Sequence, residues 1–247
     1  MSTETFLQRR ALLTAVLVLT LPLAAHAERV PGSGRSSTES RALAAFQAVA
    51  LSGDLELRVR QGPEQRVEVT ADDNLLPYLE TEVRGSAGEA QLVLRWKRGA
   101  AAQPRSRAQV SVTMPRLTAL SASGSGDMIV ERFETPALAL RIAGSSNTLL
   151  RDLAAGRLEI GITGSGDVQG TGSAEQLAIR ISGSGDVDLA ELKAETATVS
   201  IAGSGDVRVQ PRASLEVRIA GSGEVRYRGE PAKVSARVAG SGDVRKE

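Results

Sequence analysis

The sequence contains no cysteine, and its single histidine, His26, lies inside an N-terminal segment that resembles a cleavable leader. Without cysteine there is no disulfide, no thiol nucleophile and no cysteine for lipid attachment. Without a histidine after residue 27 there is no Ser-His-Asp or Cys-His catalytic arrangement and no Cys/His zinc site. These two absences exclude several large classes of hydrolase and metalloprotein, and no cofactor is expected.

Aromatic residues are also scarce. After residue 27 the chain has only Phe46, Tyr78, Trp96, Phe133 and Tyr227. Proteins that hold bases by stacking need exposed aromatic platforms. The 30 basic and 29 acidic residues give a net charge of +1, so no strong positive field draws the chain to nucleic acid. We therefore expect no nucleic-acid partner.

Residues 1–27 have the three parts of a secretory signal peptide. Arg9 and Arg10 precede an apolar run from 11 to 25, and Ala25-His26-Ala27 is a small-x-small cleavage site. The run is shorter than the roughly 20 residues that span a bilayer. We predict cleavage after Ala27, no remaining transmembrane segment, and export to the periplasm or outer cell surface. Loss of Arg9, Arg10 and Glu4 leaves 28 basic and 28 acidic residues.

A tetrapeptide, Gly-Ser-Gly-Asp, recurs through the second half of the chain. Its copies begin at Gly124, Gly164, Gly183, Gly203 and Gly240, and two looser copies begin at Gly144 and Gly221. Successive copies are 18 to 20 residues apart. A near-constant period of this length is typical of repeat architectures.

Each repeat contains two strand-like segments on either side of the tetrapeptide. Leu177, Ile179 and Ile181 alternate with polar residues and so share one face of a strand. One such face cannot be buried alone, but stacked repeats bury it. A unit of this size has no room for a helix. We predict an all-β fold in which residues 116–247 form a β-solenoid, similar to a parallel β-helix, of about seven coils.

Two segments precede the solenoid. Residues 28–43 contain turn formers and lack apolar periodicity, which predicts a disordered tether. Residues 44–115 contain alternating runs such as Leu55, Leu57 and Val59, which predict an N-terminal β region packed on the solenoid.

The order of these motifs resembles the head GIN domain family of putative auto-transporter adhesins, an exported bacterial family without an assigned activity. The resemblance covers residue 46 to the C-terminus. It implies an all-β, β-helical fold and a cell-envelope setting, and it carries over no catalytic residue. The matching segments are Phe46-Gln47-Ala48-Val49, Gly53-Asp54-Leu55-Glu56-Leu57, Asp72-Asp73-Asn74, Pro115-Arg116-Leu117 and the Gly-Ser-Gly-Asp copies.

The residue that closes each tetrapeptide is the main candidate for a functional site. If the coils stack, these residues form one row with like charges about 5 Å apart. Bound Ca²⁺ would relieve the repulsion, and a partner could also recognise the row. The alternative is that each side chain bonds the backbone of its own turn. The row consists of Asp127, Asn147, Asp167, Asp186, Asp206, Glu224 and Asp243.

Basic residues form a second pattern. Arg141, Arg180, Arg218 and Arg237 each lie three residues before a tetrapeptide. Arg208, Arg226 and Arg245 each lie two residues after a closing acid. Alternation places both sets on outer faces, where they serve solubility or bind a polyanion such as an acidic glycan.

Three functions remain open. The favoured one is an exported, non-enzymatic, adhesin-like module that binds an envelope component or glycan through a solenoid face. The second is a structural envelope element. The last coil shows no polar capping unit, so it could form a homo-oligomer through its open edge. The third is a β-helical carbohydrate-active enzyme that uses a carboxylate pair.

Overall fold

The computed structural model describes residues 28–86 and 88–247. The predicted signal peptide lies outside these residues. The N-terminal part contains β1 (Glu28–Pro31), β2 (Ser36–Ser40), β3 (Ala48–Gly53), β4 (Glu56–Gln61), β5 (Arg66–Asp72), the 3-10 helix η1 (Leu76–Tyr78), β6 (Leu79–Arg84), β7 (Gln91–Trp96), β8 (Ala100–Gln103) and β9 (Gln109–Met114). It is followed by β10 (Ala119–Gly124), β11 (Asp127–Glu131), β12 (Glu134–Gly144), β13 (Thr148–Gly164), β14 (Val168–Gly183), β15 (Val187–Gly203), β16 (Val207–Gly221), β17 (Glu224–Tyr227), β18 (Lys233–Gly240) and β19 (Asp243–Lys246).

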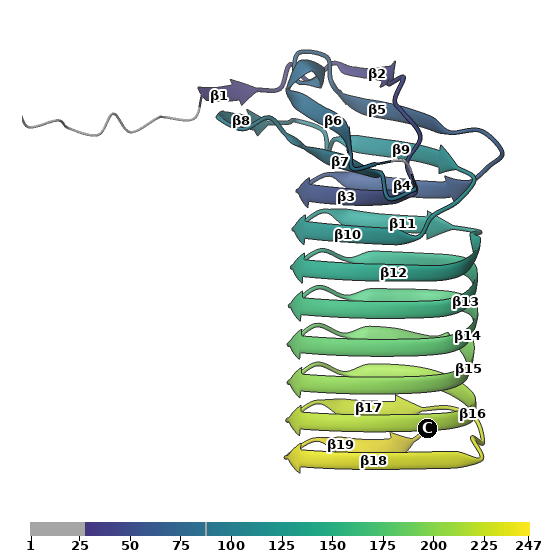
Figure 1. Cartoon of the computed structure of the whole chain (residues 1–247). Helices are drawn as coiled ribbons and strands as arrows, with labels where there is room; N and C mark the ends of the chain where they lie inside the picture. The colour runs from purple at the N-terminus through teal and green to yellow at the C-terminus, as the bar shows by residue number, and fades with distance from the viewer. Residues whose placement is uncertain (1–27, 87) are drawn as a thin grey trace, which may run out of the picture.

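The strands stack as the coils of a parallel β-solenoid, which confirms the predicted fold class (Figure 1). Sheet 1 contains β3, β10, β12, the later halves of β13 to β16, and β18. Sheet 2 contains β4, β11, the first residues of β13 to β16, β17 and β19. Counted by the corner glycines, the stack has eight levels from Gly53 to Gly240, of which seven lie within residues 116–247.

The core is a set of inward rows between the two sheets. In the coil around β14, Leu177, Ile179 and Ile181 are 1–2% exposed, and equivalent residues above and below them are buried alike. Alternate residues along each strand therefore point inward, as the sequence pattern predicts.

Glycine at the corner is required by both backbone and packing. The first corner glycines lie in register from Gly53 to Gly240, with φ between +99° and +140°. A Cβ on Gly124 would lie 2.7 Å from the carbonyl oxygen of Gly53 in the coil above. Side chains are excluded here because the backbones of successive corners touch.

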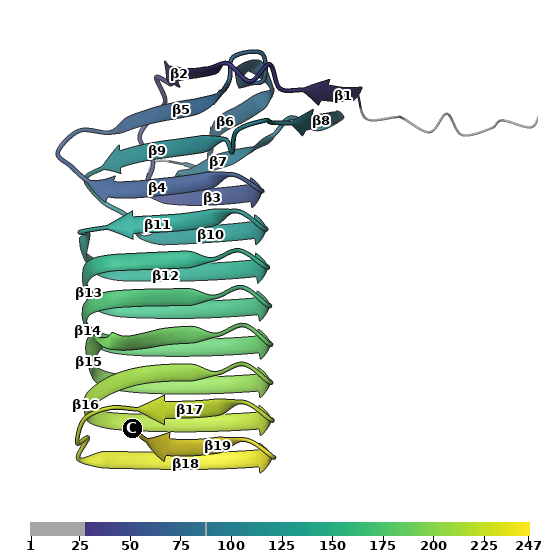
Figure 2. The ribbon, with the colours of Figure 1, turned by 180° about the vertical axis from the view of Figure 1, so that it is seen from behind.

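A cap of mixed strands covers the N-terminal end. Strands β7 and β9 pair in parallel with β3 and β4. On these, β6 pairs antiparallel with β7, β5 with β9, and β2 with β5. Figure 2 shows the cap and the stacked coils from behind.

Two boundaries differ from the sequence prediction. Residues 28–43 were expected to be disordered, and this was wrong: they contain β1, which pairs with β8, and β2. Composition did not reveal them because their partner strands lie far away in the sequence. The solenoid also begins before residue 116, because β3 and β4 already form a coil beneath the cap.

Candidate functional site

The predicted row of closing residues does form one line along sheet 2. The strand register stacks Asp127, Asn147, Asp167, Asp186, Asp206, Glu224 and Asp243 on successive coils. Glu56 in β4 pairs with Asp127 and extends the row by one member. Its corner is spelled Gly53-Asp54-Leu55-Glu56, so the tetrapeptide pattern alone does not find it.

In the middle of the row, Asp167, Asp186 and Asp206 bond the next coil and not their own turns, which differs from the structural alternative. The backbone N–H of Asp186 donates to Asp167 Oδ1 at 3.0 Å, and that of Asp206 donates to Asp186 Oδ1 at 2.8 Å. The N–H of Glu224 donates to Asp206 Oδ1 at 3.0 Å. Each of these three carboxylates thus accepts a hydrogen bond from the next coil, which lowers the cost of stacking like charges.

The ends of the row behave differently. Asp127 accepts from Asn147 Nδ2 at 3.2 Å and forms an ion pair with Arg107. Asp243, in the last coil, accepts from the N–H of its neighbour Val244 at 2.8 Å. Within residues 28–86 and 88–247, no three His, Cys, Asp or Glu side chains are grouped so that they could hold a metal ion. The row therefore offers single carboxylates along a line.

One corner departs from the repeat. Ser146 stands where the other tetrapeptides have their second glycine, and Thr148 stands in an inward row otherwise occupied by apolar residues such as Met128 and Val168. Ser146 is 0% and Thr148 3% exposed. Neither hydroxyl has a hydrogen-bond partner among the described residues. This irregularity weakens the core instead of opening a site.

The two arginine sets lie on opposite faces of the solenoid. On sheet 2, arginines are paired: Arg208 lies 3.2 Å from Asp188, and Arg226 lies 2.5 Å from Glu224. Arg245 also contacts Glu224. This face is a network of neighbouring opposite charges, which favours a role in stability and solubility.

Sheet 1 has a different charge pattern. Its arginine row is interrupted, because Gly161 lies between Arg141 and Arg180, and Ser200 lies between Arg180 and Arg218. Arg218 pairs with Glu216 at 2.5 Å. Arg141 and Arg180 are exposed and make no ion pair with any residue that the structure describes. Two guanidinium groups that lack a salt-bridge partner among the described residues therefore flank a glycine on this face.

A shallow groove of about 460 Å³ lies at the same place. Its walls include Arg141 and Arg180, and Gly161 forms part of its floor. Hydroxyl groups also line the groove, supplied by Ser52, Ser121, Ser123, Thr163 and Ser182. We call this the sheet 1 groove. Sequence spacing identified the two arginines but not the gap between them.

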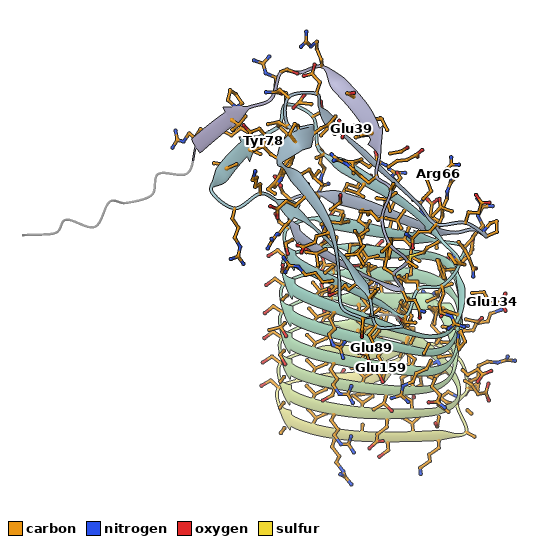
Figure 3. The ribbon with its side chains drawn as sticks, turned by 45° about the horizontal axis from the view of Figure 1, so that its top comes forward. Glu39, Arg66, Tyr78, Glu89, Glu134 and Glu159 are labelled. Carbon is orange, nitrogen blue, oxygen red and sulfur yellow. The ribbon has the colours of Figure 1, made fainter. Side chains whose placement is uncertain are left out.

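Glu159 lies close to the groove on the outer face of sheet 1, below the cap (Figure 3). The pKa of Glu159 lies below its ordinary value, mainly because Arg157 donates a hydrogen bond to its carboxylate. Burial opposes this shift, whereas the charges of Arg157, Arg180 and Arg141 add to it. Glu159 therefore interacts with the charges of Arg141 and Arg180 and offsets part of them beside the groove.

A family model described as "Putative auto-transporter adhesin, head GIN domain" matches residues 45–231. None of the curated proteins compared with the chain matches it significantly. No helix in the described part of the chain has the length and apolar character needed to cross a membrane.

Solved structures share the fold. A putative adhesin from Bacteroides fragilis NCTC 9343 is 21% identical, with a TM-score of 0.80, and the match covers 88% of this chain and 100% of that chain. A putative adhesin from Parabacteroides distasonis ATCC 8503 is 25% identical, with a TM-score of 0.72, over 89% of this chain and 100% of that one. A protein from the same strain, described as a putative lipid binding protein, is 24% identical, with a TM-score of 0.72, over 89% and 100%.

Proposed function

Because this chain belongs to the head GIN domain family of putative auto-transporter adhesins, we propose that it is an exported, non-enzymatic binding module of the cell envelope. Its partner is an acidic glycan or another anionic envelope polymer, bound on the outer face of sheet 1. The observation that carries this proposal is the pair of exposed arginines, Arg141 and Arg180, which lie on either side of the sheet 1 groove without a salt-bridge partner among the described residues.

The spacing of the groove suits a polymer. Arg141 and Arg180 are two coils apart, so their backbones are separated by about 10 Å. The bare backbone at Gly161 lets a chain approach closely between them, and the neighbouring hydroxyls can donate to sugar oxygens. A rigid sheet holds all these groups in place before binding, which reduces the entropy lost on association.

Several features support a binding role over catalysis. The described residues contain no histidine or cysteine, and the acids of sheet 2 are engaged by backbone N–H groups and arginines. The sheet 1 groove contains no carboxylate among its lining residues. A glycosidase would need two facing carboxylates.

Export is the second part of the proposal, and the sequence of residues 1–27 supports it. N-terminal sequencing of the protein from its native host should find Glu28 as the first residue. Retention of Met1 in the periplasmic or surface fraction would contradict cleavage at this site, and a purely cytoplasmic location would contradict export.

Binding is tested by retention of the protein on immobilised heparin, with neutral dextran as the reference. We expect retention at low salt and elution at modest salt, since the contacts are ionic. The double variant Arg141→Gln and Arg180→Gln should elute much earlier. Gly161→Val should also weaken binding, because it fills the groove floor without changing any charge.

The matched control is the double variant Arg151→Gln and Arg208→Gln, which removes the same charge from sheet 2. This variant should be retained on immobilised heparin as strongly as the unmodified protein. Equal losses in both double variants would show attraction by net charge alone. Flow-through of the unmodified protein at low salt would refute binding to polyanions.

One observation favours a second, structural role. The last coil leaves Val234 and Val238 exposed, at 43% and 42%, so self-association of the solenoid would cover apolar surface. This role is compatible with polymer binding, and its geometry is developed below.

A further inference from the structure

The coil formed by β18 and β19 leaves the end of the solenoid core uncovered. Val234 and Val238 continue the inward rows of Leu215 and Ile219, with Ala236 between them. Leu215 and Ile219 are 1% and 2% exposed, whereas the two valines exceed 40%. They are the exposed large hydrophobic side chains among the residues that the structure describes.

The backbone of this coil is also open. Strand β18 pairs with β16 on one side only, and β19 pairs only with β17. Figure 1 shows both at the end of the solenoid opposite the cap. An edge with free N–H and C=O groups and apolar side chains is a template for another strand.

The opposite end of the molecule cannot supply that strand by continuing the coil. There β7 and β9 cover β3 and β4, and the antiparallel strands β6, β5 and β2 follow. Among residues 28–86 and 88–247, no large apolar side chain is exposed at this end. A head-to-tail stack would place the exposed valines against the mixed strands of a cap, so the matching surface is a second copy of the same coil.

We propose that two copies of this chain stack end to end through β18 and form a closed, two-fold symmetric dimer. A two-fold axis across the solenoid makes the facing strands antiparallel. An isologous contact uses the same surface on both copies, so growth stops at two. This proposal is independent of the ligand proposed above.

Strand β18 must face β18 of the second copy, not β19. Strand β19 has only four residues, and its two inward positions hold Val244 and the polar Lys246. It is too short to cover Val234 and Val238 together. Strand β18 has eight residues and an identical row to offer.

The pairing register follows from the alternation of side chains. Inward residues must face inward residues. The register that covers both valines places Val234 opposite Val238 of the second copy, Ala236 opposite its own equivalent, and Arg237 opposite Ser235. The register shifted toward the corner would place Arg237 opposite Arg237, where like charges repel.

The contact is of moderate size. Eight residues span about 26 Å, and two sheets about 10 Å apart with their outer side chains give a width of about 20 Å. Two such ends bury about 1,000 Å² in total, near the lower limit for a specific interface. We therefore expect a dimer whose population depends on protein concentration in the micromolar range.

Charge gives the dimer a salt dependence opposite to that of polyanion binding. In the last coil, Lys246 is paired with Glu230 and Arg245 with Glu224. Lys233 and Arg237, both on β18, form no ion pair with any residue that the structure describes, so they bring uncompensated positive charge to the contact. Two positive ends repel each other, and salt screens that repulsion. Added salt should therefore strengthen the dimer while it weakens heparin retention, so that the two proposals can fail separately.

The dimer also has a consequence for binding, which rests on the proposed function. A two-fold axis through β18 and perpendicular to sheet 1 places both sheet 1 faces on the same side. One long anionic polymer could then occupy both grooves, and its second contact would be intramolecular.

The test is sedimentation of the purified protein over a range of concentrations, with small-angle scattering for shape. A monomer–dimer equilibrium and a particle of about twice the length are expected. The double variant Val234→Lys and Val238→Lys should be monomeric and keep its sheet content. Thr198→Lys, on an outer position of a central coil, should dimerise normally.

Register is tested by cross-linking, for which the absence of cysteine provides a clean background. Ala236→Cys should form a disulfide-linked dimer on mild oxidation, because the two residues face each other across the pair. Ser235→Cys should not. A protein that stays monomeric at high concentration, assemblies larger than two, or equal cross-linking of both variants would overturn the proposal.

Discussion

The backbone N–H of Asp206 donates a hydrogen bond of 2.8 Å to the carboxylate of Asp186 in the preceding coil. The same contact joins Asp167 to Asp186 and Asp206 to Glu224. The repeated acid therefore accepts a hydrogen bond from the next coil, which stabilises the stack. Electrostatic repulsion between the neighbouring carboxylates of the row opposes this stabilisation.

Substitutions at Asp186 separate these two terms. Asp186→Asn keeps an acceptor and removes charge, so it should be neutral or slightly stabilising. Asp186→Ala removes the acceptor and should be about 1 kcal/mol less stable than Asp186→Asn. The measurement is the denaturant midpoint of the two variants, with Glu175→Gln as an exposed control. Equal stability of the two variants would show that the hydrogen bond contributes nothing.

Two glycines on sheet 1 should respond in opposite ways to alanine. Gly124 has φ +119°, and a Cβ there would lie 2.7 Å from the Gly53 carbonyl oxygen. We expect Gly124→Ala to cost about 3 kcal/mol, because both backbone and packing oppose it. At Gly161 the nearest atom to a Cβ is Leu140 O at 3.9 Å. Gly161→Ala should raise the free energy of unfolding by about 0.5 kcal/mol, because glycine in a strand loses more conformational entropy on folding than alanine does. Thermal unfolding of both variants checks the difference in sign.

The irregular corner provides a stabilising substitution. The Thr148 hydroxyl is buried in an apolar row and has no partner among the described residues. Thr148→Val keeps the shape and removes the unpaired hydroxyl, so unfolding should require about 1 kcal/mol more. Thr198→Val, at an exposed outer position of β15, should change stability by less than about 0.5 kcal/mol. A destabilised Thr148→Val protein would indicate that a water or another group satisfies the hydroxyl.

Acid should weaken the C-terminal coils through Glu224. The pKa of Glu224 lies below its ordinary value, mainly because Arg226 donates a hydrogen bond to its carboxylate, and the charges of Arg245 and Arg208 lower it further. A depressed folded-state pKa means that the stabilisation is present above the unfolded value, about 4.3, and is lost as pH falls through the folded value. The melting temperature of the unmodified protein should therefore drop more steeply below about pH 4.5 than that of Glu224→Gln. Parallel curves would refute this role.

Much of the architecture could be predicted because one period repeats. The spacing of the tetrapeptides and the alternation of residues such as Leu177 and Ile179 determine the coil and its core. The corner at Gly53 escaped the pattern because the cap separates it from Gly124. The direction of the Asp186 carboxylate also depends on a neighbouring coil, which one strand's sequence does not specify.

Long-range contacts explain the other differences. Strand β2 has the sequence Ser-Ser-Thr-Glu-Ser, which shows no apolar alternation. It becomes a strand because β5 offers it an edge. The sheet 1 groove forms where Gly161 lies between Arg141 and Arg180 on successive coils. The two arginines are 39 residues apart in the sequence, so the groove appears only when the coils are stacked.

A buried carboxylate, Asp72, contributes to the attachment of the N-terminal segment beside the pairing of β1 with β8 and of β2 with β5, and this contribution is testable. Asp72 is 0% exposed; its Oδ1 accepts from the N–H of Gly34 at 3.0 Å, and its Oδ2 accepts from the N–H of Arg105 at 2.8 Å. Asp72→Ala would leave both N–H groups without this acceptor and release residues 28–40 from the cap. Trypsin should then cleave after Arg35 much faster, while the solenoid stays intact, since local opening governs proteolysis. Glu68→Ala, on the same strand, is the matched control. Unchanged cleavage in Asp72→Ala would show that pairing of β2 with β5 suffices to hold the segment.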